Sequence, residues 1–197
     1  MQALILESHL HLIVLYIALF ACFGPEWLGW FFQRSGKTAV KRDRGSHLVL
    51  LVALATGVTA AFFLVGALPA ATIAWRQPLV FWSGIAIMFI GLALRWYAIR
   101  VLGKFFTRDV ATHAGQHVVE SGPYRWVRHP SYSGALLMFL GTGVAMTNWA
   151  SLLVILLAAA IGYGYRVHVE EGALCDDLGD AYRNYMRRTR RFIPWVW

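Results

Sequence analysis

Charged side chains are scarce in this sequence: Asp, Glu, Lys and Arg make up 14% of its 197 residues, whereas 58% are hydrophobic. A soluble domain of this length carries a charged fraction nearer to about a quarter. The apolar residues fall in four or five long runs, which approach or exceed the roughly 18 residues needed to span a bilayer. This excludes an ordinary soluble domain and predicts one compact, all-α polytopic membrane protein.

Cysteine is also rare, and the two residues, Cys22 and Cys175, lie in an apolar run and in a basic tail. They do not form a disulfide framework, and neither stands at a metal-ligand spacing, so no metal site is expected. The N-terminus lacks a charged segment and a small-residue cleavage site, so we expect its apolar run to be a retained helix. Internal repeats are missing too, which gives no support to an inverted-repeat transporter.

Five runs fit membrane helices, at about residues 9–32, 48–68, 78–99, 131–147 and 149–167. Only a residue or two separates the last two runs, which predicts a tight C-terminal helical hairpin. The tail beyond it has apolar residues at spacings suited to an interfacial C-terminal helix. Glycines in the last two runs are expected to be close-packing positions within the hairpin: Gly134, Gly141, Gly143, Gly162 and Gly164.

Positive charge is sorted along the chain. All Lys and Arg residues except Arg76 fall in or beside three segments: residues 33–47, residues 95–130 and the tail from Arg166. With five spans these segments lie on one side of the membrane, which the positive-inside rule makes cytoplasmic. The N-terminus is then expected outside, and the C-terminus and active site in the cytoplasm. We attribute the net charge of +8 to contact with anionic lipid and expect no nucleic-acid partner.

Polar side chains gather in two places on that side of the membrane. One is residues 105–132 and the other is the end of the fifth run, residues 166–171. A tight hairpin brings its two open ends together, so His129 and Arg166 are expected at the same membrane level. Arg166 and Glu170 are four residues apart, which places them on one face of a helix.

Taken singly, these residues have plainer explanations. An interfacial histidine or tyrosine needs no catalytic role, and Arg125 and Arg128 at a helix start fit lipid-headgroup anchors. Arg166 with Glu170 would contribute little as a surface ion pair. The arginines of the tail are expected to form a solvated face that attracts lipid: Arg183, Arg187, Arg188, Arg190 and Arg191.

The combination of these elements resembles the isoprenylcysteine carboxyl methyltransferase family, and the related phospholipid N-methyltransferases share parts of it. The resemblance covers about residues 105–194. It is carried, in chain order, by Gly122–Tyr124, Arg128–Gly134, Arg166–Leu174 with its paired Glu170 and Glu171, and Leu178–Tyr185. We therefore divide the chain into an N-terminal three-helix membrane region, 1–104, and a methyltransferase-like region, 105–197.

The family implies methyl transfer from S-adenosyl-L-methionine to a lipid-borne or hydrophobic acceptor at the bilayer. Carried over by position, Arg166 and Glu170 become the catalytic residues on the acceptor side. A carboxylate acceptor would need only an orienting cation, whereas an amine or thiol would need a proton acceptor, for which Glu170 is the candidate. The cofactor would be lined by the region around Asp109 and by Gln116, His117, Val118, Val119, Tyr124, His129, Pro130, Ser131, Tyr132 and Glu171.

Two other functions fit part of this pattern. A membrane sterol or acyl reductase would use a similar His-Pro-x-Tyr stretch to hold NADPH, although the paired Glu170 and Glu171 favour a methyltransferase. A scaffold or transporter would place its polar residues nearer the membrane midplane. The sequence leaves open whether the acceptor is a carboxylated isoprenoid, a phospholipid amine, or a small hydrophobic thiol or acid, and it leaves the oligomeric state open.

Overall fold

A computed structural model of the chain describes residues 2–32, 40–41, 45–106, 111–112 and 117–193. Almost all of this part is helical. The elements in chain order are α1 (Leu4–Glu7), α2 (His9–Phe32), β1 (Val40–Lys41), α3 (Ser46–Ala67), η1 (Pro69–Ala71), α4 (Gln77–Leu102), η2 (Gly103–Phe105), β2 (Ala111–Thr112), η3 (Gly122–Arg125), α5 (Pro130–Ala145), α6 (Trp149–Leu178) and α7 (Asp180–Arg188).

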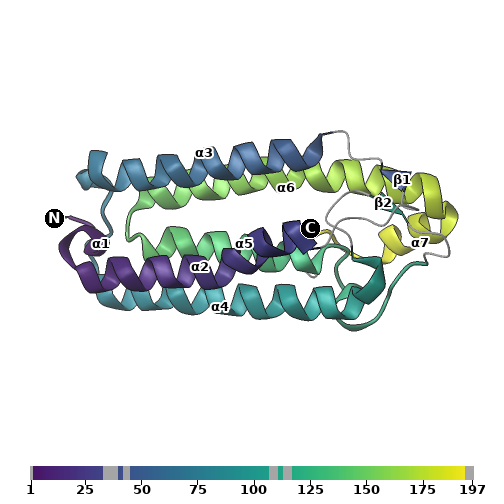
Figure 1. Cartoon of the computed structure of the whole chain (residues 1–197), viewed down its shortest axis with the longest axis horizontal. Helices are drawn as coiled ribbons and strands as arrows, with labels where there is room; N and C mark the ends of the chain where they lie inside the picture. Colours follow the sequence, from purple (N-terminus) through teal and green to yellow (C-terminus); the bar gives the residue numbers. More distant parts are fainter. Residues whose placement is uncertain (1, 33–39, 42–44, 107–110, 113–116, 194–197) are drawn as a thin grey trace.

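The five long helices run side by side along the long axis of the molecule, as Figure 1 shows. We call the end that carries α7 and the two short strands the basic end. The strands β1 and β2 pair there in antiparallel register, with Val40 opposite Thr112, which joins the first basic segment to the second. The described parts of the three segments rich in Lys and Arg therefore meet at the basic end, around the start of α5 and the end of α6.

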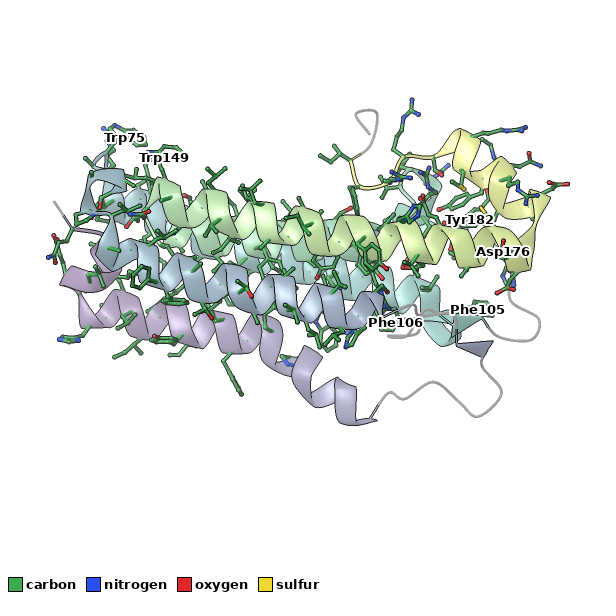
Figure 2. All side chains as sticks on the ribbon, turned by 90° about the horizontal axis from the view of Figure 1, so that it is seen from above. Trp75, Phe105, Phe106, Trp149, Asp176 and Tyr182 are labelled. Carbon is green, nitrogen blue, oxygen red and sulfur yellow. The ribbon has the colours of Figure 1, made fainter. Side chains whose placement is uncertain are left out.

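The opposite end is built from short connections that bond to one another. The backbone N–H of Ile73 donates to the carbonyl of Thr147, and the side-chain amide of Asn148 donates to the carbonyl of Leu68. Asn148 also caps α6, because its Oδ1 accepts the N–H of Ser151 at 3.1 Å. Trp75 and Trp149 are exposed at this end, far from Asp176 and Tyr182 at the basic end (Figure 2), as expected of an interfacial aromatic belt.

Within the part of the chain that the structure describes, three helices, α3, α4 and α6, are long and apolar enough to cross a membrane. The apolar part of α2, His9–Pro25, is shorter, and α5 has 16 residues. The prediction of an all-α polytopic membrane protein is confirmed, and the number of five spans stays a prediction. One helix boundary was wrong: α6 continues to Leu178 instead of ending near residue 167, because Gly179, with φ of 56°, is the residue that ends it.

The helices pack as two pairs, α4 with α5 and α3 with α6 (Figure 1). Glycines let the backbones of α4 and α5 approach closely: a Cβ added to Gly134 would lie 2.6 Å from the carbonyl oxygen of Gly91. The expectation that all the glycines serve the α5–α6 hairpin was therefore wrong. Gly143 does face α6, at Leu152, whereas Gly162 faces α3, at Leu50, and a Cβ on Gly164 would meet nothing.

This difference between glycines is testable. Gly134→Ala is expected to destabilise the protein by about 1–3 kcal/mol or more, because backbone of α4 stands where the added methyl group would go. The measurement is thermal unfolding in detergent, with Gly164→Ala as the matched control, since nothing lies within 4 Å of its added Cβ. Equal melting temperatures for the two variants would contradict the close approach of α4 and α5.

Candidate functional site

The segment that leads into α5 is held by hydrogen bonds from α7. The hydroxyl of Tyr185 donates to the carbonyl of Tyr124 at 2.6 Å. Burial raises the pKa of both tyrosines well above the usual range, so both phenols stay protonated and Tyr185 remains a donor. Pro130 begins α5, as its position before the apolar run predicts.

Glu171 is the centre of a buried charge cluster. Glu171 is only 5% exposed, and three cations or potential cations surround its carboxylate. Nε of Arg128 donates to Oε1 at 2.8 Å, Nε2 of His129 lies 3.3 Å from the same oxygen, and Arg191 donates to Oε2 at 3.0 and 3.1 Å. A carboxylate removed from water needs this many donors to remain charged.

The chain near its C-terminus completes this cluster. Residues 189–193, which we call the C-terminal segment, run beside the segment that enters α5. The N–H groups of Arg128 and His129 donate to the carbonyls of Arg190 and Arg191, and the hydroxyl of Ser133 donates to the carbonyl of Phe192. Arg128 donates as well to the carbonyls of Met186 and Thr189. These bonds fix Arg191 beside Glu171.

A second network joins α5, α6 and α3. The hydroxyl of Tyr132 donates to Oε2 of Glu170 at 2.7 Å, and Nε of Arg166 lies 3.4 Å from the same hydroxyl. Nη1 of Arg166 donates to Oγ of Ser46, the first residue of α3, at 2.9 Å. The Arg166 side chain is thus a buried cation held by hydroxyl groups from two other helices.

Stacked aromatic rings connect the two networks. The rings of His129 and Tyr132 are nearly parallel, with an interplanar angle of 7° and centroids 5.5 Å apart. On its other side Tyr132 meets Tyr163 of α6, with ring centroids 5.2 Å apart. The apolar faces of these rings lie beside the charged groups, so the site can hold a molecule that is part ionic and part hydrophobic.

The structure brings five of the predicted site residues into direct contact with one another: His129, Tyr132, Arg166, Glu170 and Glu171. Tyr124, Pro130 and Ser131 are buried next to them, and Arg95 of α4 donates to the carbonyl of Ser131 at 3.0 Å. His117 packs edge-on against Phe105 instead, and Val118 and Val119 are half-buried beside it in sequence. Asp109 and Gln116 lie outside the described residues.

Sequence reasoning missed four residues of the site. Arg128 and Arg191 were expected at lipid headgroups or solvent, yet both bind Glu171. Arg128 lies within the motif that begins α5, so its position next to His129 was a usable signal. The sequence gives no such signal for Ser46 or Arg95, because a single serine or arginine near the end of an apolar run fits many roles.

The start of α5 has few backbone N–H groups left to bind an anion, although a helix N-terminus is often such a site. The N–H groups of Tyr132 and Ser133 donate to the carbonyl of His129 within the first turn, and the N–H of His129 donates to Arg191. Most donors of this helix start are therefore occupied, which leaves side chains as the main recognition groups. The available chemistry is a fixed guanidinium, a neighbouring carboxylate and stacked aromatic rings.

The sequence around this site is similar to that of known proteins. Residues 84–176 match the model of the "Isoprenylcysteine carboxyl methyltransferase (ICMT) family". A protein-S-isoprenylcysteine O-methyltransferase of Schizosaccharomyces pombe is 31% identical over 58% of this chain and 49% of its own length. Protein-S-isoprenylcysteine O-methyltransferase B of Arabidopsis thaliana is 31% identical over 57% and 58%.

The likeness extends to three dimensions. A solved structure of the eukaryotic intramembrane Ras methyltransferase superposes with a TM-score of 0.59 at 25% identity, over 74% of this chain and 52% of that one. The chain thus spans between about half and three fifths of the length of these relatives. In sequence and in fold, this chain is thus similar to the isoprenylcysteine carboxyl methyltransferase family, whose model it matches over residues 84–176.

Proposed function

We propose that the chain is an integral membrane methyltransferase that uses S-adenosyl-L-methionine to methylate the carboxylate of an isoprenylcysteine-like acceptor. The observation that carries this proposal is the Tyr132–Glu170–Arg166 network, which joins the motif residues of α5 and α6. The names of the relatives agree with it, since they are isoprenylcysteine O-methyltransferases. We further propose that the basic end faces the cytoplasm, because it gathers the Lys and Arg residues.

The residues at this network suit the proposed donor. A sulfonium carries positive charge, and the Glu170 carboxylate with the ring faces of Tyr132 and Tyr163 offers a suitable environment for a cation. When bound, S-adenosyl-L-methionine supplies an activated methyl group, whose bond to sulfur breaks as a bond to the acceptor oxygen forms. The electron pair of the broken bond stays on sulfur.

The contribution of the protein is then alignment and exclusion of water. A carboxylate is already a nucleophile, so Arg166 needs only to hold it in line with the methyl group. Glu170 acts through the Tyr132 hydroxyl, which it fixes at 2.7 Å. His129 stacks on Tyr132 and lies within hydrogen-bond distance of Glu171, so it supports the donor side of the site. Burial of these groups strengthens each of their interactions.

The proposal is tested with purified protein, deuterated S-adenosyl-L-methionine and N-acetyl-S-farnesylcysteine, which carries a free carboxylate. The expected product, seen by mass spectrometry, is a labelled methyl ester that alkali hydrolyses. Phosphatidylethanolamine in the same assay tests the amine alternative, whose product would survive alkali. Label found only on the amine would replace our proposal by N-methylation, and no label on either acceptor would overturn it.

We also predict that His129→Ala weakens binding of S-adenosylhomocysteine tenfold or more, equivalent to about 1.4 kcal/mol. The reason is that the stack on Tyr132 and the contact with Glu171 are both lost. Calorimetry measures the affinity, with His168→Ala as control because His168 lies exposed on α6. Unchanged affinity in His129→Ala would remove this residue from the donor site, and protection of the protein by NADPH alone would favour a reductase.

A further inference from the structure

We infer that Ser46 is a positioning residue that aims the Arg166 guanidinium at the acceptor, an inference that rests on the proposed function. Ser46 lies outside residues 84–176, the segment that matches the family model. Its hydroxyl accepts the Nη1 hydrogen bond of Arg166 at 2.9 Å, and the residues are 0% and 3% exposed. The site therefore includes a contribution from the N-terminal helices.

The geometry of the guanidinium explains why this contact matters. The group is planar and rigid, so two anchored nitrogens determine the direction of its remaining N–H groups. One anchor is the Tyr132 hydroxyl, which lies a long 3.4 Å from Nε. The bond to Ser46 is shorter and comes from a different helix. Without it, the guanidinium loses the shorter of these two hydrogen bonds, and its direction is less firmly set.

The support behind Ser46 is firm. The helices α3 and α6 are in close contact along their length: a Cβ on Gly57 would clash with the Ala158 side chain, and one on Gly162 would lie 2.8 Å from Leu50. Because close packing sets the register of the two helices, the hydroxyl at the start of α3 has a fixed place relative to Arg166.

The same interface offers a matched control at its other end. The hydroxyl of Ser151 on α6 donates to the carbonyl of Ala61 on α3 at 2.8 Å, and this serine is also 0% exposed. Ser46→Ala and Ser151→Ala thus each remove one buried hydroxyl that crosses the α3–α6 interface. They differ in that only the first touches Arg166.

The test is steady-state methylation of N-acetyl-S-farnesylcysteine by the full chain in detergent. Ser46→Ala is expected to lower kcat about tenfold, with KM for S-adenosyl-L-methionine within about twofold of the original protein, because the donor side is untouched. Ser46→Thr, which keeps the hydroxyl, should recover activity to within about threefold. Ser151→Ala should retain kcat while losing a comparable amount of thermal stability.

Four results would overturn the inference. If the original protein is active, full activity of Ser46→Ala would overturn this inference and leave the proposed function intact. An equal loss of kcat in Ser151→Ala would do the same. No methylation by the original protein would overturn both it and the proposed function. If Ser46→Thr does not fold, the test is repeated in a protein that already carries Arg166→Lys. Adding Ser46→Ala there should lower kcat less than twofold. A further tenfold loss of kcat would show that Ser46 does not act through the guanidinium.

Discussion

Arg166→Ala is expected to lower kcat for carboxylate methylation about a thousandfold, with the helices still folded. Arg166 is the buried cation that joins the Tyr132–Glu170 network. Loss of one preorganised charge at a reacting centre typically costs about a hundredfold to a thousandfold. Arg166→Lys keeps the charge but not the planar fork, so about a hundredfold loss is expected there.

The control for this experiment is Arg125→Ala, since Arg125 is exposed at the same end of the molecule and its guanidinium lies 5.4 Å from the Trp126 ring centroid. Its kcat should remain within about twofold of the original value. Glu170→Ala should resemble Arg166→Ala, because the Tyr132 hydroxyl then loses its acceptor. Retained binding of S-adenosylhomocysteine shows that each variant is folded. Near-normal kcat in both Arg166→Ala and Glu170→Ala would take these residues out of the mechanism.

The largest loss of stability is expected for Glu171→Ala. This substitution leaves the guanidinium of Arg128 buried without its carboxylate and releases Arg191 and His129 as well. Breaking a buried ion pair by removing one partner costs about 3–5 kcal/mol. The measurement is the melting temperature in detergent, together with protease sensitivity of the C-terminal segment, whose bond from Arg191 to Glu171 is lost.

Glu120→Ala provides the matched control for that stability prediction. Glu120 pairs with Arg188 at 2.9 Å, but both side chains are substantially exposed. An exposed ion pair contributes only about 0–1 kcal/mol, so the melting temperature should barely change. A loss in Glu171→Ala no greater than that in Glu120→Ala would show that the buried cluster does not hold the start of α5.

The sequence predicted the local parts of the site well. The one-residue separation of the last two apolar runs indicated that His129 and Arg166 share a membrane level, and the structure has Tyr132, three residues after His129, beside Arg166. The spacing of Arg166 and Glu170 placed them on one helix face. Such inferences need only the periodicity of a helix and the geometry of a short turn.

Contacts between distant segments could not be read in this way. Nothing in the glycine spacing shows whether Gly134 meets α4 or α6, because a small residue permits close approach without choosing the partner. The assignment of Arg191 to a solvated face failed for a similar reason. A basic tail usually attracts lipid, and only the folded chain reveals that a buried carboxylate, Glu171, draws one of its arginines inward.

The length of α6 indicates the depth at which the site lies in the membrane. A helix rises about 1.5 Å per residue, so the 21 steps from Trp149 to Glu170 cover about 32 Å. The hydrocarbon core of a bilayer is about 30 Å thick. If Trp149 marks one surface of this core, Glu170 lies at the opposite surface, where the core meets water. At this depth a hydrophobic chain can remain in the lipid core while a polar nucleoside remains in water.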